Sequence, residues 1–303
     1  MGTPEFAVAS LQKLVEAGCN IVGVITAPDK QAGRGMQLQH SAVKKYALAN
    51  NLNILQPEKL KNAEFLDQLN ALHADVQTVV AFRMLPEQVW NMPPMGTINV
   101  HASLLPQYRG AAPINWAIIN GEKYTGVTTF KLQQQIDTGN ILLSQKIDIE
   151  ATDTAGTVHD KLKDIGANLL LQTLKGLAAG KLIDTPQSEY SNLNTQYLKH
   201  APKLTTLTGN ISWQNTVQNV YNLIRGLSPY PAAYTKLQNK TLKIFTTKIH
   251  TEVLDLNVGD YKTDGKNYLL FGCSNGAMEI IELQLEGKKR MLVQEFLRGY
   301  RFS

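Results

Sequence analysis

The residues with the clearest chemical potential lie near the middle of the chain. Asn99 and His101 are two positions apart in a predicted strand, so their side chains share one side of it. An Asn amide can hold a carbonyl oxygen as negative charge develops on it, and an imidazole can exchange a proton near neutral pH. Asp137, in Asp-Thr-Gly, could orient that imidazole. These side chains suit acyl transfer, although a single His at a strand end or Asp in a turn is also compatible with a structural role.

Around these residues the predicted elements alternate between strand and helix. Short apolar runs predict parallel strands at residues 21–25, 52–55, 76–82 and 97–101. Helical patterns lie at residues 6–16, 41–50, 63–73 and 154–179, and a later strand pair lies at residues 126–132 and 141–149. This order predicts an α/β domain with a Rossmann-like parallel sheet and an antiparallel extension. Asn99 and His101 then lie near the carboxyl end of their strand, where such sheets place their sites.

The start of the chain departs from this pattern. A doubly wound fold normally opens with a strand that leads through a tight glycine turn into the first helix. Here Gly2-Thr3-Pro4 makes the turn and residues 6–16 the helix, but only Met1 precedes them. We therefore expect the domain to lack its first strand, roughly five to six residues, and we expect a start codon assigned too late or a shortened chain.

The last third of the chain has a different pattern and a different charge. Predicted strands at residues 242–250, 268–272 and 278–285 follow a predicted helix at 216–225, which indicates a small OB-like β-barrel. Residues 203–303 contain 13 Lys or Arg and 8 Asp or Glu, so they account for the whole formal net charge of +5. This excess favours either a solvated basic face or a module that binds a polyanion. The predicted domains are residues 1–185 and 204–303, joined by a linker at 186–203.

Composition excludes several classes of protein. With 43% hydrophobic and 18% charged residues, the 303-residue chain is neither disordered nor rich in membrane-spanning segments. The apolar runs are far shorter than the ~20 residues that cross a bilayer, and no signal peptide is visible. Two cysteines, Cys19 and Cys273, cannot by themselves form a disulfide framework or a metal site. We expect a cytoplasmic monomer without a metal or a membrane partner.

Several segments together resemble one known family. They are residues 2–7, 28–35, 99–106, 108–114, 137–139, 201–203, 223–229 and 287–291. The Asn-x-His, Leu-Pro and Asp-Thr-Gly residues resemble the formyltetrahydrofolate-dependent formyltransferases, and the resemblance covers nearly the whole chain. Gly33-Arg34-Gly35 and residues 225–229 are similar to the branch of that family that acts on charged tRNA.

This resemblance implies a reaction and its catalytic residues. The α-amine of methionine on charged initiator tRNA would attack the formyl carbon of 10-formyltetrahydrofolate, in preparation for translation initiation. Asn99 and His101 would stabilise the oxyanion, and Asp137 would orient His101 or manage the amine proton through water. By the same resemblance, the folate would be held by Ser103, Leu104, Leu105 and Pro106, with Phe82 and Leu85 as an apolar wall for its pterin ring. Residues 1–185 would be the catalytic domain and residues 204–303 the tRNA-binding domain.

The resemblance also implies a set of tRNA contacts. Glycines on both sides of Arg34 allow a close backbone approach, and an Arg can grip a phosphate through two hydrogen bonds. The predicted contacts are Lys30, Arg34, Lys203, Arg225, Lys288, Lys289 and Arg290. A flexible surface loop and solvated lysines are the alternative interpretations of the same residues.

Two alternative functions remain open. A formyltransferase for an amino sugar-nucleotide would share the catalytic residues and a similar C-terminal barrel. A non-catalytic RNA-binding protein would have lost turnover with its first strand. Phe82-Arg83 stands where the family often has Tyr-Gly, a difference that bears on the pterin wall.

Overall fold

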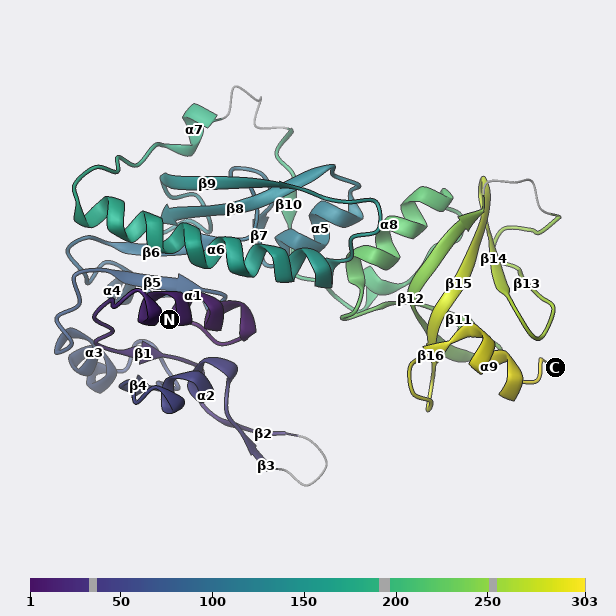
Figure 1. The fold of residues 1–303 in the computed structure, drawn as a ribbon, viewed down its shortest axis with the longest axis horizontal. Coiled ribbons are helices and arrows are strands. Elements are labelled where there is room, and N and C mark those ends of the chain that lie inside the picture. Colours follow the sequence, from purple (N-terminus) through teal and green to yellow (C-terminus); the bar gives the residue numbers. More distant parts are fainter. Residues whose placement is uncertain (33–36, 191–196, 251–254, 303) are drawn as a thin grey trace. The chain divides into compact units, whose positions relative to one another are not determined.

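The computed structural model of the chain describes residues 1–32, 37–190, 197–250 and 255–302 (Figure 1). These residues form two compact units. The N-terminal unit contains residues 1–110, 125–147 and 159–200, and the C-terminal unit contains residues 111–124, 148–158 and 201–303. The units are therefore not consecutive in the chain. The division into residues 1–185, 186–203 and 204–303 stays a prediction.

The elements follow one another along the chain as alternating helices and short strands. Up to residue 110 they are α1 (Glu5–Glu16), β1 (Val24–Ile25), β2 (Lys30–Ala32), β3 (Gln37–Gln39), α2 (Ala42–Ala49), β4 (Ile54–Leu55), α3 (Ala63–Asn70), β5 (Gln77–Val80), α4 (Glu87–Trp90), β6 (Thr97–His101) and β7 (Arg109–Gly110). They continue with α5 (Pro113–Ile119), β8 (Tyr124–Lys131), β9 (Ile141–Asp148), α6 (Ala155–Ala178), α7 (Gln187–Tyr190) and β10 (His200–Ala201).

The N-terminal unit is an α/β structure, as predicted from the order of elements. β1 pairs with β4 and β5 pairs with β6, both in parallel, while β8 pairs with β6 in the antiparallel direction and β9 lies next to β8. Long helix α6 covers one face of this sheet (Figure 1). Gly166 of α6 lies so close to β6 that an added Cβ would come 3.1 Å from Val100 Cγ1. Ile98 and Val100 are therefore core residues, and the alternation of a strand sends Asn99 and His101 to the opposite face.

The parallel sheet is interrupted between β1 and β5. Gly2 donates its N–H to Ile25 O (3.1 Å), and Val80 donates its N–H to Met1 O (3.0 Å), so Met1 and Gly2 bridge one end of the interval. The rest of the interval is a cavity of about 560 Å³ bordered by Ile21–Val24 and Val76–Thr78. Apolar side chains of α1, α3 and α6 also line it, among them Leu14, Leu69 and Leu174. The interval has the position of a further parallel strand.

In the C-terminal unit a curled antiparallel sheet packs against helices (Figure 1). Its elements are a short 3₁₀ helix η2 (Leu207–Gly209), α8 (Val217–Leu227), β11 (Ala233–Leu237), β12 (Lys240–His250), β13 (Tyr261–Thr263), β14 (Leu269–Cys273), β15 (Gly276–Leu285), β16 (Met291–Leu292) and α9 (Val293–Gly299). The strand order is β11-β12-β15-β14-β13, with β16 on β15. Thr216 caps α8, and Trp213 stacks on Phe271 in the core, with ring centroids 4.6 Å apart. The predicted strands and helix of this region are confirmed, and the OB-like topology stays a prediction.

An apolar strand placed ahead of Met1 should stabilise the N-terminal unit. We expect an extension of about five β-branched residues to raise the midpoint of thermal unfolding, because it fills the cavity and pairs with the backbone of β1 and β5. The matched control is an extension of equal length made of Gly and Ser. Equal midpoints for the two extended proteins, measured by circular dichroism, would show that the interval does not accept a strand.

The amino group of Met1 gives a second prediction. It donates to Thr78 O (2.6 Å), and burial lowers its pKa from 8.0 to about 5. Folding therefore releases a proton between pH 5 and pH 8, so the free energy of unfolding should rise with pH across that window. Urea titrations of the protein that begins at Met1 should show this rise. The same protein with an acetylated N-terminus should show a smaller one, and an identical slope for the two would contradict this origin of the pH dependence.

Candidate functional site

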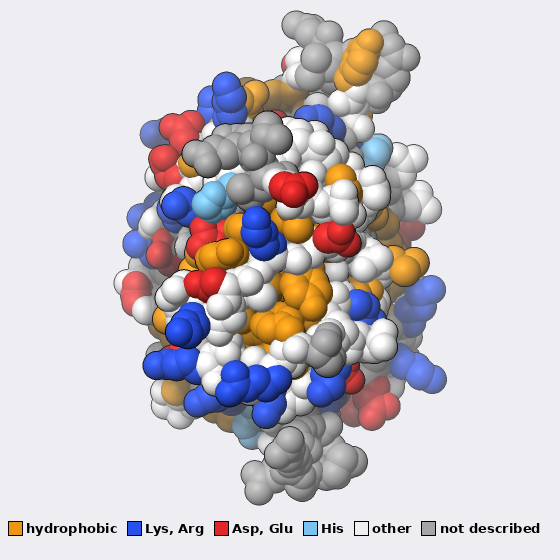
Figure 2. All heavy atoms as spheres, turned by 90° about the vertical axis from the view of Figure 1, so that its right-hand side faces the viewer, with side chains coloured by type: hydrophobic (Ala, Val, Ile, Leu, Met, Phe, Trp, Pro, Cys, Tyr) orange, Lys and Arg blue, Asp and Glu red, His pale blue; other side chains and the backbone are white. Residues whose placement is uncertain are grey.

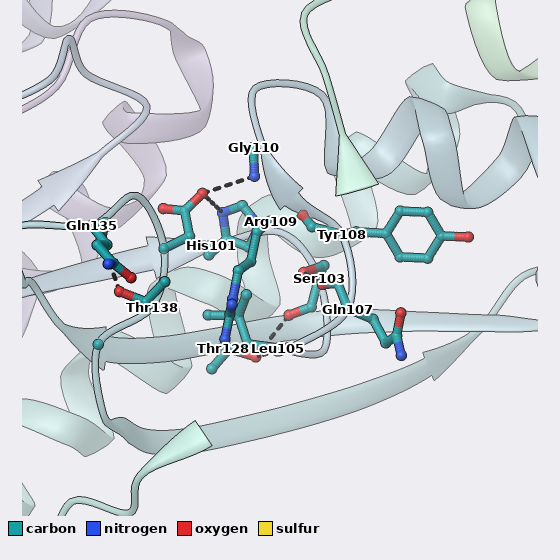
Figure 3. A network of polar contacts seen from close by, with 12 residues as sticks. His101, Ser103, Leu105, Gln107, Tyr108, Arg109, Gly110, Thr128, Gln135 and Thr138 are labelled. Carbon is teal, nitrogen blue, oxygen red and sulfur yellow. Dashed lines mark hydrogen bonds and ion pairs between the residues drawn. The ribbon is translucent and has the colours of Figure 1, made fainter. Parts of the chain in front are cut away.

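Asn99, His101 and Asp137 come from two neighbouring parts of the N-terminal unit. Asn99 and His101 lie on β6, and Asp137 lies on the segment that joins β8 to β9. His101 is only 7% exposed, and its Nδ1 is 3.8 Å from Asp137 Oδ2. The same carboxylate oxygen accepts a hydrogen bond from Gly110 N–H (2.9 Å). Dashed lines in Figure 3 mark these two contacts at the labelled residues His101 and Gly110.

The imidazole of His101 is held on both sides. Its Nε2 donates to Tyr108 O (2.9 Å), while Nδ1 faces Asp137 (Figure 3). The distance of 3.8 Å to the carboxylate is beyond hydrogen-bond length, and it allows an ion pair or a proton path through one water molecule. The ring also packs edge-on against Phe130, with centroids 6.4 Å apart. His101 is thus oriented by one hydrogen-bond acceptor, Tyr108 O, and by one aromatic ring, with the Asp137 carboxylate close to its other nitrogen.

Asn99 differs from His101 in that its amide is not engaged. The side chain is half-buried on the same face of β6. Within the described part of the chain it makes no side-chain hydrogen bond, whereas His101, Asp137 and Ser103 all do. Its amide can therefore donate to an oxygen of a bound molecule without breaking a contact in the protein.

The turn after β6 is fixed by hydroxyl groups. Ser103 Oγ donates to Gln107 O (2.7 Å), and Thr128 Oγ1 donates to Ser103 O (2.7 Å) and accepts from Leu105 N–H (3.1 Å) (Figure 3). Leu105 packs into a small core cluster with Phe130 and Ile141. Ser103, Leu104, Leu105 and Pro106 therefore form a rigid edge directly after His101. Sequence reasoning missed Thr128, which no motif marks.

Phe82 and Leu85 have different environments. Leu85 is buried in the core with Val79 and Val89, and Phe82 is partly buried at the margin of that core. Arg83 lies over the Phe82 ring, 5.5 Å from its centroid, and donates to Glu58 O (2.8 Å) and to Pro57 O. Packing accounts for Leu85, and Phe82 lies where β5 has ended, at the same sheet edge as His101. A pterin contact stays a prediction for both.

The seven basic residues singled out from the sequence have four different environments. The side chains of Lys30, Lys203, Lys288 and Lys289 are exposed. Arg290 is paired with Glu282 (2.6 Å) and stacks 4.1 Å from the Phe245 ring centroid. Arg34 lies outside the described residues.

Arg225 is buried in the C-terminal unit, and a tRNA contact stays a prediction for it. It is 8% exposed, and its guanidinium donates to Asn222 Oδ1 (2.9 Å) and Asp153 O (3.0 Å). Burial lowers the pKa of this guanidinium. The nearby Tyr221 and Asp153 act in the opposite direction and raise that pKa. Its motif position predicts a tRNA contact, but its hydrogen bonds are made within the protein.

The base of the β2–β3 hairpin is held by an acidic residue that sequence reasoning did not use. Asp29 accepts from Lys44 Nζ (2.5 Å) and Gln56 Nε2 (3.0 Å), and lies 3.1 Å from His40 Nδ1. The hydrogen bonds from Lys44 and Gln56 lower the pKa of Asp29 to about 2. Asp29 precedes β2 and His40 follows β3, so these contacts fix both ends of the hairpin that carries Lys30.

Metal-binding clusters and membrane-spanning helices are both missing from the described ranges. Over these residues, no three or more His, Cys, Asp or Glu side chains gather in a way that could hold a metal ion. Among the same residues, no helix is both long and apolar enough to span a membrane. The chemical groups gathered at the edge of the sheet are an amide, an imidazole and a carboxylate.

Comparison with known proteins identifies the family of the chain. A family described as formyl transferase matches residues 1–174, and one described as formyl transferase, C-terminal domain, matches residues 203–301. A protein of Bacteroides fragilis named methionyl-tRNA formyltransferase is 51% identical over 308 residues, covering 100% of this chain and 94% of its own. One of Flavobacterium johnsoniae with the same name is 49% identical, covering 100% and 96%.

Solved structures of more distant proteins share the fold. WlaRD, a sugar 3N-formyl transferase solved with dTDP and 5-N-formyl-THF, has a TM-score of 0.68 at 21% identity, covering 95% of this chain and 97% of that chain. An N-formyltransferase from Helicobacter canadensis, in complex with folinic acid and dTDP-3-aminofucose, has a TM-score of 0.67 at 18% identity, covering 96% and 97%. The family matches over both parts of the chain, with relatives about half identical over its whole length, show that this chain belongs to the formyl transferase family.

Proposed function

We propose that this chain transfers a formyl group from 10-formyltetrahydrofolate to the methionine α-amine of charged initiator tRNA. The observation that carries the proposal is the arrangement of Asn99, His101 and Asp137 at one edge of the sheet. Relatives named methionyl-tRNA formyltransferase, aligned over the whole chain, support the acceptor. Structural neighbours solved with tetrahydrofolate or formyl-THF support a folate donor.

The residues of the site suit a folate bearing a formyl group. The unengaged amide of Asn99 provides a donor for the formyl oxygen, and Phe82 provides an apolar surface at the same edge of the sheet. Ser103–Pro106 would bound the folate on the other side, in a turn that Thr128 fixes. When bound, the folate supplies the electrophilic formyl carbon.

Each catalytic side chain then has one task. Asn99 donates a hydrogen bond to the formyl oxygen as negative charge develops on it. His101, held by Tyr108 O and facing Asp137, places its imidazole beside that oxygen. Asp137 would accept the proton that the attacking amine must lose, directly or through one water molecule, and that proton would pass to N10 of the folate as its bond to the formyl carbon breaks. No step in this sequence requires a redox change.

Phosphate contacts of the tRNA are assigned to the exposed lysines. Lys203, Lys288 and Lys289 lie in the C-terminal unit, and Lys30 lies on the hairpin anchored by Asp29. Figure 2 shows that an apolar centre on the side of β13, β14 and the C-terminus is bordered by Lys and Arg side chains, with Asp and Glu side chains among them. We leave Arg225 and Arg290 out of the direct contacts, because both are engaged within the protein. Arg34, a monomeric state and a cytoplasmic location stay predictions.

The acceptor decides between this proposal and the amino sugar alternative. Sugar N-formyltransferases share the fold at about 20% identity, which is too distant a similarity to identify the acceptor. Purified protein should be given 10-formyltetrahydrofolate with methionyl initiator tRNA, methionyl elongator tRNA or a dTDP-amino sugar. We expect transfer to the initiator tRNA to dominate. Transfer to the sugar alone, or tRNA binding without transfer to any acceptor, would overturn the proposal.

Removing the side chain of Asn99 should slow transfer without weakening tRNA binding. We expect Asn99→Ala to lower kcat by about 10²–10³, the usual cost of losing one donor to a developing oxyanion. Asn70→Ala, an exposed amide at the end of α3, is the matched control. Single-turnover kinetics and filter binding give the two quantities. A fall in tRNA affinity as large as the fall in rate would mean that Asn99 has been assigned the wrong role.

Removing exposed lysines should weaken tRNA binding and reduce its dependence on salt. The logarithm of the tRNA binding constant should fall with the logarithm of the salt concentration. We expect the double variant Lys288→Ala/Lys289→Ala to reduce the magnitude of this slope by about one for each phosphate that the variant no longer neutralises. Lys59→Ala/Lys61→Ala, which removes the same charge from an exposed part of the N-terminal unit, is the control. An equal change in both double variants would indicate only a general effect of net charge.

A further inference from the structure

Gln187 is buried in a segment that the sequence predicts to be a linker. It begins the short helix α7 and is only 4% exposed. Its amide nitrogen Nε2 donates to Asp137 O (2.9 Å) and to Gly139 O (2.8 Å). Its carbonyl oxygen Oε1 accepts from Arg109 Nε (3.0 Å) and Nη2 (2.5 Å). Both hydrogens and both lone pairs of the amide are used, so the side chain has one favourable orientation.

These contacts reach Asp137 and the residue next to the donor of its carboxylate. On one side, Gln187 holds the backbone of Asp137 itself. On the other, it holds the side chain of Arg109, whose neighbour Gly110 donates its N–H to Asp137 Oδ2 (2.9 Å). The result is a closed ring of contacts that passes through Gln187, Asp137, Gly110 and Arg109. A shift of Gln187 would therefore move the carboxylate and its donor together.

The segment that carries Asp137 has little support from regular structure. Asp137 has a φ of 53°, in the left-handed region that non-glycine residues rarely occupy. Two residues later, a Cβ at Gly139 would come 1.6 Å from Lys131 O, so the turn also requires a close backbone approach. A backbone in this conformation persists only when its surroundings hold it. The two hydrogen bonds from Gln187 Nε2 supply such a restraint on both sides of Thr138.

We propose that Gln187 is a positioning residue that holds Asp137 at its working distance from His101. This inference rests on the proposed function, because it assigns Gln187 a role in the same reaction. The amide is required since it must donate to two carbonyl groups and accept from a guanidinium. A carboxylate at this position could accept from Arg109 but could not donate to the Asp137 and Gly139 carbonyl groups.

Kinetics in two backgrounds separate positioning from general structural support. We expect Gln187→Met, which preserves length without hydrogen bonding, to lower kcat about tenfold or more with little change in KM for the tRNA, since small displacements of catalytic groups are costly. In an Asp137→Asn background the same substitution should lower kcat no further, because the carboxylate that it positions is already gone. Gln133→Met, an exposed amide on the same segment, is the matched control.

A pH profile adds a readout that simple destabilisation would not give. In Gln187→Glu, the protonated carboxyl can donate to one carbonyl group and the ionised form can donate to none. The deficit in kcat relative to the unaltered protein should therefore shrink as pH falls, while Gln187→Met should show a deficit that does not follow this trend. Unfolding midpoints of all variants are measured alongside, so that rates are compared at temperatures where each is folded.

Hydrogen exchange tests the role of Gln187 independently of formyl transfer. The Gly110 amide donates to Asp137, so its exchange should speed up in Gln187→Met and remain unchanged in Gln133→Met. If the unaltered protein transfers no formyl group, the proposed function fails while this exchange result still tests the role of Gln187. An unchanged Gly110 amide, an unchanged kcat, or losses that add fully in the Asp137→Asn background would each overturn the inference.

Discussion

The site depends on the placement of a single carboxylate. Asp137 Oδ2 accepts a hydrogen bond from Gly110 N–H and lies 3.8 Å from His101 Nδ1, so one oxygen connects β7, β6 and the segment after β8. The imidazole on the other side is held by Tyr108 O. Among the described residues, Asn99 makes no side-chain hydrogen bond on the same face. In the proposed reaction, the protein therefore positions His101 and Asp137, and the Asn99 amide is available to the formyl oxygen.

The sheet supplies the rigidity behind that arrangement, but it is continuous only on one side of β5. β6 lies between β5 and β8, and α6 packs so closely on it that a Cβ added at Gly166 would come 3.1 Å from Val100 Cγ1. Between β5 and β1, by contrast, Met1 and Gly2 form a short bridge beside an apolar cavity of about 560 Å³. The proposed catalytic residues lie on the well-packed side, and the strand β6 that carries Asn99 and His101 has partners on both edges.

Sequence patterns predicted the α/β order, the shared face of Asn99 and His101, and the strands of the C-terminal unit, because period-two alternation and short apolar runs report local structure directly. They did not predict Gln187, whose polar, aperiodic surroundings indicate a linker. Its burial arises from contacts with residues 48 to 78 positions away. The burial of Arg225 could not be predicted from the sequence either. Its motif position favours an RNA contact, whereas its hydrogen bonds to Asn222 and Asp153 O place it inside the protein.

The central role of the Asp137 carboxylate is tested most directly by the single-turnover rate of formyl transfer to methionyl initiator tRNA in Asp137→Asn. This substitution keeps the shape of the side chain and removes its negative charge and its ability to take a proton. We predict a fall of about 10²–10⁴ in rate, the range attributed to a positioned general base, with tRNA affinity unchanged. A rate close to that of the unaltered protein would contradict the role given to this carboxylate.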